Sequence, residues 1–314
     1  MEPGLLKSAD WPLLIDLYFF LGGIAGGAFV IATIAQMLDS QRYRDVVRVG
    51  YYLALLAIIP APIFLIVDLG VSSRFLHMMM VAKPDAAIGV GAINIGPFHL
   101  KPLSPMNAGA WALLGFSGFA FLAALLVFLE DVRKAARLGG LRVVVGIIGG
   151  FFAFFMAAYP GVLLGATARP LFVSAHWLGA MFVAVGMATG GAAIALIMSS
   201  MGAQARDALS RLMKVTAFAL IIQLVTLILF LVAVSSAGSA GSSRALSVLV
   251  SGQYSVAFWL GIVVVGLLVP LALQFGGAIR KANPGMVALI SVLVLLGGFL
   301  AKWVIIGAGQ MVLS

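Results

Sequence analysis

Long apolar segments, separated by short polar ones, run through the whole chain. Eight of them reach about 20 residues, the length that a helix needs to cross the hydrocarbon core of a bilayer. These segments are residues 15–38, 50–68, 107–129, 143–165, 175–199, 213–234, 254–276 and 285–311. The second carries Pro60 and Pro62, so we expect a kink there. The pattern predicts an all-α integral membrane protein, with eight transmembrane helices bundled into one domain over residues 1–314.

Composition agrees with this prediction. Apolar residues make up 63% of the 314 positions, charged residues only 9%, and mean hydropathy is +1.18. Soluble domains of this length do not have that balance. The net charge of +9 would suit a nucleic-acid partner, but the basic residues lie in short loops between the apolar segments. Such a distribution is the orientation signal of a membrane protein and not the phosphate-binding surface of a nucleic-acid-binding protein.

The basic residues also predict the orientation. Twelve of the 19 Lys and Arg residues fall in the loops 39–49, 130–142, 200–214 and 277–284. Since positive loops stay in the cytoplasm, both termini should be extracytoplasmic. We expect a multi-pass protein of the prokaryotic cytoplasmic (inner) membrane. Residues 1–14 contain Glu2, Lys7 and Asp10 and show no cleavage pattern, so no removable signal peptide is expected.

The numbers of cysteines and histidines argue against cofactors that this chain would have to bind with its own side chains. There is no cysteine, so the chain cannot hold an iron–sulfur cluster with its own thiolates or form a disulfide. Its three histidines, His77, His99 and His176, all lie toward the extracytoplasmic face, and none falls in the middle of a span. Haem anchors need histidines facing each other across the bundle, so we expect no haem. His99 is predicted to be a surface or partner-contact residue.

Polar residues that are energetically costly inside a membrane gather near the extracytoplasmic face. They are Asp16, Tyr18, Asp68, Arg74, His77, Tyr159, Thr167, Arg169, His176, Lys302, Trp303 and Gln310. The other half of the bundle offers little in comparison, namely Thr33, Gln36, Thr189, Gln223 and Gln274. This asymmetry is typical of a site for a lipophilic molecule with a polar head. Separate explanations also exist: Asp68 can pair with Arg74 at the interface, and tyrosine and tryptophan belong to the aromatic belt.

Lys302 is the most informative of these residues. An ammonium inside a span is costly unless a partner, a cavity or snorkelling relieves it, so it marks a candidate functional site. The alternative is that the side chain reaches the interface, about two turns away. Asp16 shares a helical stripe with Phe20 and Gly23 and should face the bundle. The small-residue pairs Gly22/Gly26, Gly23/Gly27, Gly146/Gly150 and Gly186/Gly190 predict close helix contacts.

Five stretches resemble the membrane subunits of polysulfide-reductase-type complexes, the NrfD/PsrC family. They are YFFLGGIAGG (18–27), DLGVSSRFLHM (68–78), SPMNAGAW (104–111), YPGVLLGATARPL (159–171) and LGGFLAKWVIIGAGQ (296–310). Together they cover essentially the whole chain in the family's order. Two positions depart from the family pattern. Relatives commonly carry arginine where Lys302 stands, and they usually lack a histidine at the position of His176.

The resemblance implies a quinone-reactive membrane subunit without haem. Such subunits exchange electrons between menaquinone or ubiquinone and an extracytoplasmic four-cluster ferredoxin-like iron–sulfur subunit. That partner connects them to a molybdopterin or multihaem catalytic subunit. The family's site residues would correspond here to Asp16, Tyr18 and Tyr159. The loop 69–106, with Met78, Met79 and Met80, is the expected docking surface, because methionine makes adaptable contacts; its alternative is a simple lid over the bundle.

Quinol oxidation releases two electrons and two protons, which suggests roles for the candidate residues. Asp16 or His176 would accept a proton. Tyr159 would hydrogen-bond a ring oxygen, and Lys302 or Asp68 would stabilise charge or pass protons outward. The remaining expected binding residues are Tyr18, Thr167, Arg169 and Gln310. Two other functions remain open: a secondary transporter, which would also show intramembrane charges, and a purely structural membrane anchor.

Overall fold

The computed structural model describes residues 11–80, 93–133, 138–167, 169–173, 176–202, 206–276 and 283–311. Within these ranges, eight helical segments are long and apolar enough to cross a membrane. They are α1 (Leu13–Asp39), α2 (Arg44–Ile58) continued by α3 (Pro60–Asp68), α4 (Pro105–Arg133), α5 (Gly139–Gly165), α7 (Leu178–Ser199), α8 (Arg206–Ser235), η4 (Ala257–Leu268) continued by α10 (Val269–Phe275), and α11 (Pro284–Gln310). The predicted all-α membrane fold is confirmed, and each predicted span corresponds to one of these segments.

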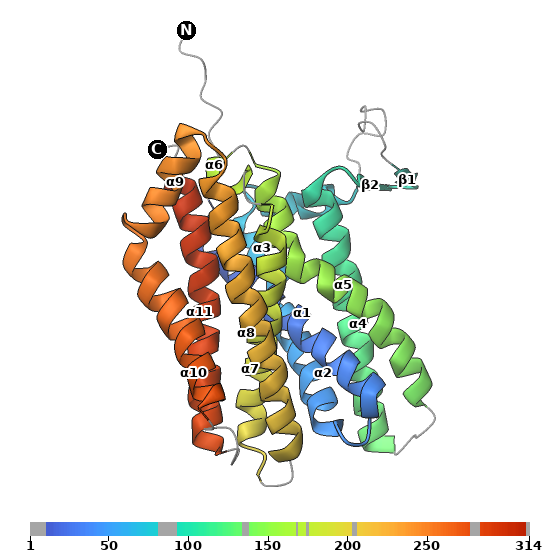
Figure 1. Ribbon diagram of the computed structural model, residues 1–314. Helices are drawn as coiled ribbons and strands as arrows, with labels where there is room; N and C mark the ends of the chain where they lie inside the picture. Colours follow the sequence, from blue (N-terminus) through green and yellow to red (C-terminus); the bar gives the residue numbers. More distant parts are fainter. Residues whose placement is uncertain are drawn as a thin grey trace.

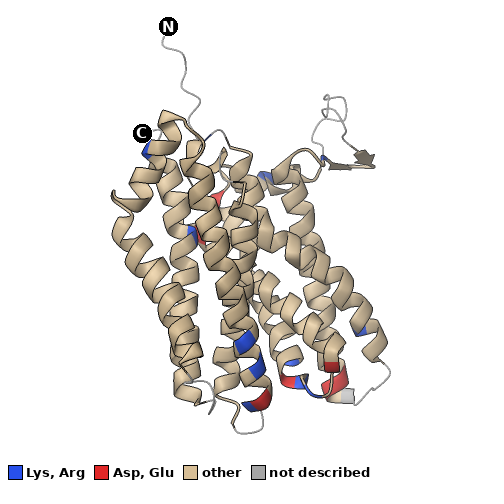
Figure 2. Cartoon of the chain, in the orientation of Figure 1, with Lys and Arg blue, Asp and Glu red and all other residues tan. Residues whose placement is uncertain are grey.

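The two ends of the bundle differ in kind. α1 begins and α11 ends at the same end, beside an antiparallel hairpin of β1 (Ile93–Ile95) and β2 (Phe98–Leu100) (Figure 1). We call this the hairpin end. Most Lys, Arg, Asp and Glu residues gather at the opposite end, which we call the arginine-rich end (Figure 2). That the arginine-rich end faces the cytoplasm stays a prediction from the basic loops.

Two helices depart from regular α geometry. The second span is interrupted at Ile59, between α2 and α3, because Pro60 and Pro62 remove backbone donors. The helix is thus interrupted where the kink was expected, while Ile59 itself keeps helical backbone angles. The seventh span begins as a π-helix, η4, which the apolar pattern did not predict. Sequence periodicity does not distinguish π from α geometry, and π segments are frequent at functional sites. A short helix, α9 (Ala240–Val250), before η4 was also not predicted.

Glycines let the central helices approach closely, as the small-residue pairs predicted. A Cβ at Gly27 of α1 would collide with the carbonyl of Gly186 on α7, and one at Gly190 would collide with the backbone of Gly27 and Ala28. Gly26 meets the backbone of Ala153 on α5 in the same way. α1 is thus held between α5 and α7 with almost no side-chain spacing. This packing places the beginning of α1 in the interior of the hairpin end.

The loop 69–106 is partly described. It contains η1 (Ser72–Met78) and the hairpin, and Met80 bridges to Phe98. Residues 81–92 of the expected docking surface lie outside the described ranges. His99 is buried rather than on the surface, and this corrects the prediction. Its carbonyl accepts a hydrogen bond from Trp111 Nε1 at 3.0 Å, because β2 folds back onto the start of α4.

Candidate functional site

Lys302 lies on α11 with no solvent exposure (0%). Its Nζ atom is 4.3 Å from the centre of the Phe182 ring on α7. A Cβ at Gly23 of α1 would lie 3.5 Å from the same Nζ atom, so the ammonium lies directly against the backbone of α1 at Gly23. The side chain therefore points into the bundle between α1 and α7. The snorkelling alternative does not describe this residue, whose charge lies in the interior.

Asp16 lies opposite Lys302 in the interior. It is only 4% exposed, as its stripe with Phe20 and Gly23 predicted. Gly23, which shares the Asp16 stripe of α1, faces Lys302 Nζ, yet the Asp16 and Lys302 side chains form no ion pair within contact distance. Asp16 Oδ1 and Lys302 Nζ are both buried without a hydrogen-bond partner among the described residues. Leaving such atoms unsatisfied is costly, so the arrangement fits a site that receives a further polar group.

A tyrosine that sequence reasoning missed completes this group. Tyr254 precedes η4 and lies against the part of α11 that carries Lys302. Its hydroxyl packs against Gly307, and its ring contacts Trp303 edge-on at 5.6 Å. No sequence signal marked Tyr254, which lies at the predicted edge of a span like many aromatic-belt residues. We call Asp16, Lys302 and Tyr254 the open acid–base group.

Hydrogen bonds join the beginning of α1 to the end of α11, near the open acid–base group. The side-chain amide of Gln310 pairs with the backbone of Trp11, accepting from its N–H at 2.7 Å and donating to its carbonyl at 3.2 Å. Arg169 donates to the carbonyl of Gly309 at 3.2 Å. The beginning of α1 and the end of α11 are thereby joined. Gln310 and Arg169 thus have structural contacts that account for their positions near the site.

Tyr18 and Tyr159 form a separate pair on another side of α1. Positions 16 and 18 are two residues apart, which is a rotation of about 200° around a helix. Tyr18 is buried and interacts electrostatically with Tyr159 of α5. The Tyr159 ring packs on Gly109 of α4 and stacks on Phe155 at 6.0 Å. The predicted tyrosines therefore lie on the neighbouring helices α1 and α5, with Tyr18 on another side of α1 from Asp16.

The remaining predicted residues lie outside the open acid–base group. His176 is exposed before α7, where it lines a hollow of about 200 Å³ together with Phe172 and Gly179. Asp68 is exposed at the end of α3. The Thr167 hydroxyl donates to the Leu164 carbonyl at 2.6 Å, which satisfies the end of its own helix α5. Within the described ranges, no group of three or more His, Asp or Glu side chains is arranged to hold a metal ion.

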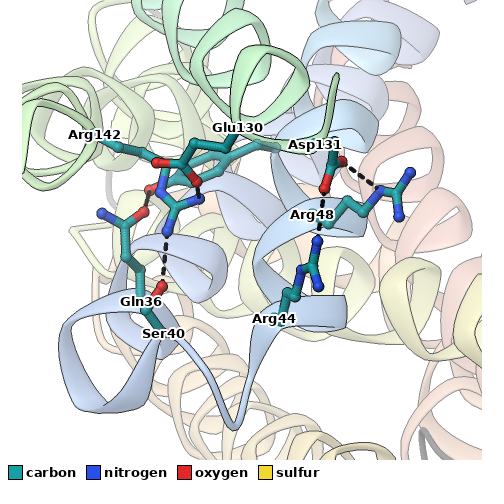
Figure 3. Close-up of polar contacts among 8 residues, drawn as sticks. Gln36, Ser40, Arg44, Arg48, Glu130, Asp131 and Arg142 are labelled. Carbon is teal, nitrogen blue, oxygen red and sulfur yellow. Dashed lines mark hydrogen bonds and ion pairs between the residues drawn. The ribbon is translucent and has the colours of Figure 1, made fainter. Parts of the chain in front are cut away.

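The arginine-rich end holds a second buried network, in which the charges are paired (Figure 3). Arg142 of α5 is 8% exposed; it forms an ion pair with Glu130 of α4 and donates to Ser40 Oγ at 2.7 Å. Deeper in the bundle, Tyr51 donates to Gln36 at 3.1 Å and lies 3.2 Å from the hydroxyl of Thr33. The sequence suggested few titratable groups in this half, because Arg142 and Glu130 counted as loop residues.

The fold and these two networks define a multi-pass membrane protein with charged groups inside its bundle. Comparison with known proteins identifies the family. The sequence model of the polysulphide reductase family NrfD matches residues 2–314. The chain therefore belongs to the NrfD family.

Individual relatives agree with this assignment. The chain is similar to the NrfD homolog of Haemophilus influenzae, with 26% identity over 97% of this chain and 95% of the relative. It is also similar to one of the chains of the polysulfide reductase of Wolinella succinogenes, with 24% identity over 96% of this chain and 93% of the relative. A subunit of the selenate reductase of Mesobacillus selenatarsenatis matches over a shorter region, with 21% identity over 27% of this chain and 20% of the relative.

Proposed function

We propose that this chain is the quinol- and quinone-reactive membrane subunit of a multisubunit respiratory oxidoreductase. The headgroup of a membrane quinone would be bound at the hairpin end, next to the open acid–base group. The single observation that supports this most strongly is that Asp16 and Lys302 are buried on neighbouring helices and unpaired. An intramembrane charge pair kept apart is difficult to explain by packing alone.

The surroundings fit a ring with polar oxygens. Gly23 and Gly186 bring α1 and α7 into close contact beside Lys302, and Phe182 presents an aromatic face to Lys302 Nζ. The ammonium is a hydrogen-bond donor, Asp16 Oδ1 is a free acceptor, and the Tyr254 phenol can act as either. A quinone or quinol needs donors and acceptors of these kinds at its two oxygens. Menaquinone and ubiquinone satisfy this requirement equally.

Quinol oxidation supplies two electrons and two protons, and the residues of this chain would handle the protons. Asp16 Oδ1 is placed to accept a proton from a ring hydroxyl. Lys302 Nζ would stabilise the resulting negative charge on a ring oxygen and keep Asp16 oriented toward the site. Tyr254, which is partly exposed, connects Asp16 with the surface of the hairpin end. In quinone reduction the same groups would deliver protons instead.

The electrons must leave through a partner, since this chain has no cysteine to hold a cluster. We propose that an iron–sulfur subunit of the four-cluster ferredoxin-like kind docks on the hairpin end. A molybdopterin or multihaem catalytic subunit would follow it. The names of the relatives, which are parts of polysulfide and selenate reductases, support such an assembly. Exposed apolar side chains on this surface, Phe75, Leu76, Ile95 and Phe98, also support docking there.

The test uses membranes that contain the native complex. A soluble quinol analogue is added anaerobically, and reduction of the iron–sulfur clusters is followed by electron paramagnetic resonance. The Asp16→Asn variant should slow cluster reduction at least about a hundredfold, because the carboxylate that accepts the proton is gone. The matched control is Asp68→Asn, which changes an exposed acid at the same end and should leave the rate within about twofold.

Three outcomes would contradict the proposal. A purely structural anchor predicts that Asp16→Asn reduces clusters as fast as the unchanged protein. A secondary transporter predicts that the chain purifies without iron–sulfur absorbance and without bound quinone. Equal losses in Asp16→Asn and Asp68→Asn would show that surface charge, and not the buried acid, controls the rate.

A further inference from the structure

The arginine-rich end contains a hollow of about 590 Å³, formed where α1, α2, α4 and α5 end or begin. This volume is in the range of sites for small molecules. Its charged lining consists of Arg44, Arg48, Arg142, Glu130 and Asp131. The hollow lies at the end of the bundle opposite the open acid–base group, so the proposed quinol chemistry gives it no role.

Among the described residues, the charges around the hollow leave one positive charge uncompensated. Three guanidinium groups face two carboxylates: Asp131 is shared by Arg44 and Arg48, at 3.1 and 3.0 Å, and Glu130 pairs with Arg142 (Figure 3). Each guanidinium has five N–H donors, and these pairs use only part of them. The Nε–H of Arg142 is buried and has no hydrogen-bond partner among the described residues. The lining therefore retains donors for one further anion.

The position of the hollow indicates which kind of anion can bind in it. Ser40 follows the end of α1, Asp131 lies near the end of α4, and Arg142 lies in the first turn of α5. Ends of membrane spans lie at the depth of lipid headgroups. Val47 and Val127 give the hollow an apolar wall, and the nearby outer faces of α4 and α5 expose Phe128 and Val144. A molecule with an anionic head and apolar chains fits both the charged lining and the apolar wall of the hollow.

We propose that this hollow binds the phosphodiester headgroup of an anionic phospholipid, with its phosphate among Arg44, Arg48 and Arg142. Guanidinium groups match phosphate geometry, and basic pockets between spans on the cytoplasmic side are known to hold such headgroups. A phosphodiester carries one negative charge, which balances the single excess positive charge. Free phosphate, with a charge of about −1.5 to −2, would overcompensate it and would leave the apolar wall without a contact.

Two glycines provide a matched pair of variants. A Cβ at Gly139 or at Gly140 would meet no atom within 4 Å, so both positions accept a larger side chain. Only Gly139 lines the hollow. Gly139→Leu should therefore obstruct the hollow, whereas Gly140→Leu adds the same side chain beside it. Arg44→Gln removes one donor from an exposed residue whose loss does not leave a buried charge unpaired.

The experiment is native mass spectrometry of the full-length protein in neutral detergent, titrated separately with phosphatidylglycerol, phosphatidylcholine and inorganic phosphate. We expect one tightly bound phosphatidylglycerol per chain, with phosphatidylcholine at least about tenfold weaker. Gly139→Leu and Arg44→Gln should each weaken phosphatidylglycerol binding about tenfold, the effect of one charge-assisted hydrogen bond. Gly140→Leu should bind it like the unchanged protein.

Each alternative outcome would overturn the proposal. Undiminished phosphatidylglycerol binding in Gly139→Leu and Arg44→Gln would show that the lipid does not occupy this hollow. Equal affinity for phosphatidylcholine would show that the excess positive charge does not select the headgroup. If inorganic phosphate displaced phosphatidylglycerol, the ligand would be a free anion and the lipid assignment would be wrong.

Discussion

Both ends of this bundle combine a buried base with an acid, but only the arginine-rich end joins the two in a direct ion pair. At the arginine-rich end, Glu130 and Arg142 form a direct ion pair that Ser40 extends. At the hairpin end, Asp16 and Lys302 are both buried but form no ion pair, and each has an unsatisfied atom. The first arrangement is that of a structural contact, because each charge has its partner.

The difference teaches that burial alone does not identify a functional charge. Arg142 and Lys302 are both almost inaccessible to solvent, and both would be conspicuous in a list of buried charges. What separates them is that Arg142 has a direct ion-pair partner, whereas Lys302 has none among the described residues. An unsatisfied pair in hydrocarbon is retained only where a ligand or a proton completes it, so the open acid–base group is the better candidate for chemistry.

The largest effect should follow from Lys302→Met, which keeps the length of the side chain and removes its charge. We expect quinol-dependent cluster reduction to fall about a thousandfold, since charge stabilisation at the ring oxygen is lost. The melting temperature of the complex should change little, because the removed ammonium had no hydrogen-bond partner in the described structure. Activity assays and thermal unfolding of the same preparation check both parts. If the melting temperature fell clearly together with the activity, Lys302 would be a structural residue.

Variants at the arginine-rich end should lower stability and leave activity nearly unchanged. Glu130→Gln leaves Arg142 buried without its carboxylate and should destabilise the protein by about 3 kcal/mol. Activity per folded molecule should stay within about threefold. The double variant Glu130→Leu/Arg142→Met should recover most of the stability, since apolar replacement of both partners avoids an unpaired charge. Thermal unfolding in one detergent compares the three proteins, and a double variant no more stable than Glu130→Gln would refute the ion-pair interpretation.

Two phenols, one at each end, allow the same comparison on a smaller scale. Tyr254→Phe should lower quinol oxidation about tenfold with little loss of stability, because its hydroxyl belongs to the open acid–base group. Tyr51→Phe should lower stability by about 1 kcal/mol without a change in activity, because its hydroxyl is bonded to Gln36. Steady-state quinol oxidation and melting curves distinguish the two. Equal activity losses would show that both ends of the bundle take part in turnover.

The smallest effect should come from His176→Ala. This histidine was predicted as a proton acceptor, but it is exposed beside the hollow that Phe172 and Gly179 also line. We expect quinol oxidation to stay within about twofold over the whole pH range. A pH profile of the variant and the unchanged protein checks this. Loss of an inflection near neutral pH in the variant would restore His176 to the site.

Much of the fold was predictable, because the bilayer fixes the length of a span. The eight apolar segments, the kink at Pro60 and the close contact of Gly27 with Gly186 all follow from local patterns. The π geometry of η4 and the short helix α9 were not predictable. Neither changes the apolar content of its segment, and hydropathy carries no other signal for them.

The site was predictable only in part. The stripe of Asp16, Phe20 and Gly23 correctly indicated an inward acid, and the cost of an intramembrane ammonium drew attention to Lys302. Their proximity joins residues 286 positions apart, which no spacing rule reveals. Tyr254 looked like an interfacial aromatic residue. Arg142 and Glu130 looked like loop charges, because the positive loop count does not show which arginine turns into the bundle.

The most direct measurement of the central claim is a cryo-electron microscopy map of the native complex with a quinol-site inhibitor bound. The account predicts ring density between Asp16 and Lys302, beside Tyr254, with the iron–sulfur subunit seated on the hairpin end. A map in which Asp16 and Lys302 close into a direct ion pair while the inhibitor lies elsewhere would contradict the account. An iron–sulfur subunit bound at the arginine-rich end would contradict it equally.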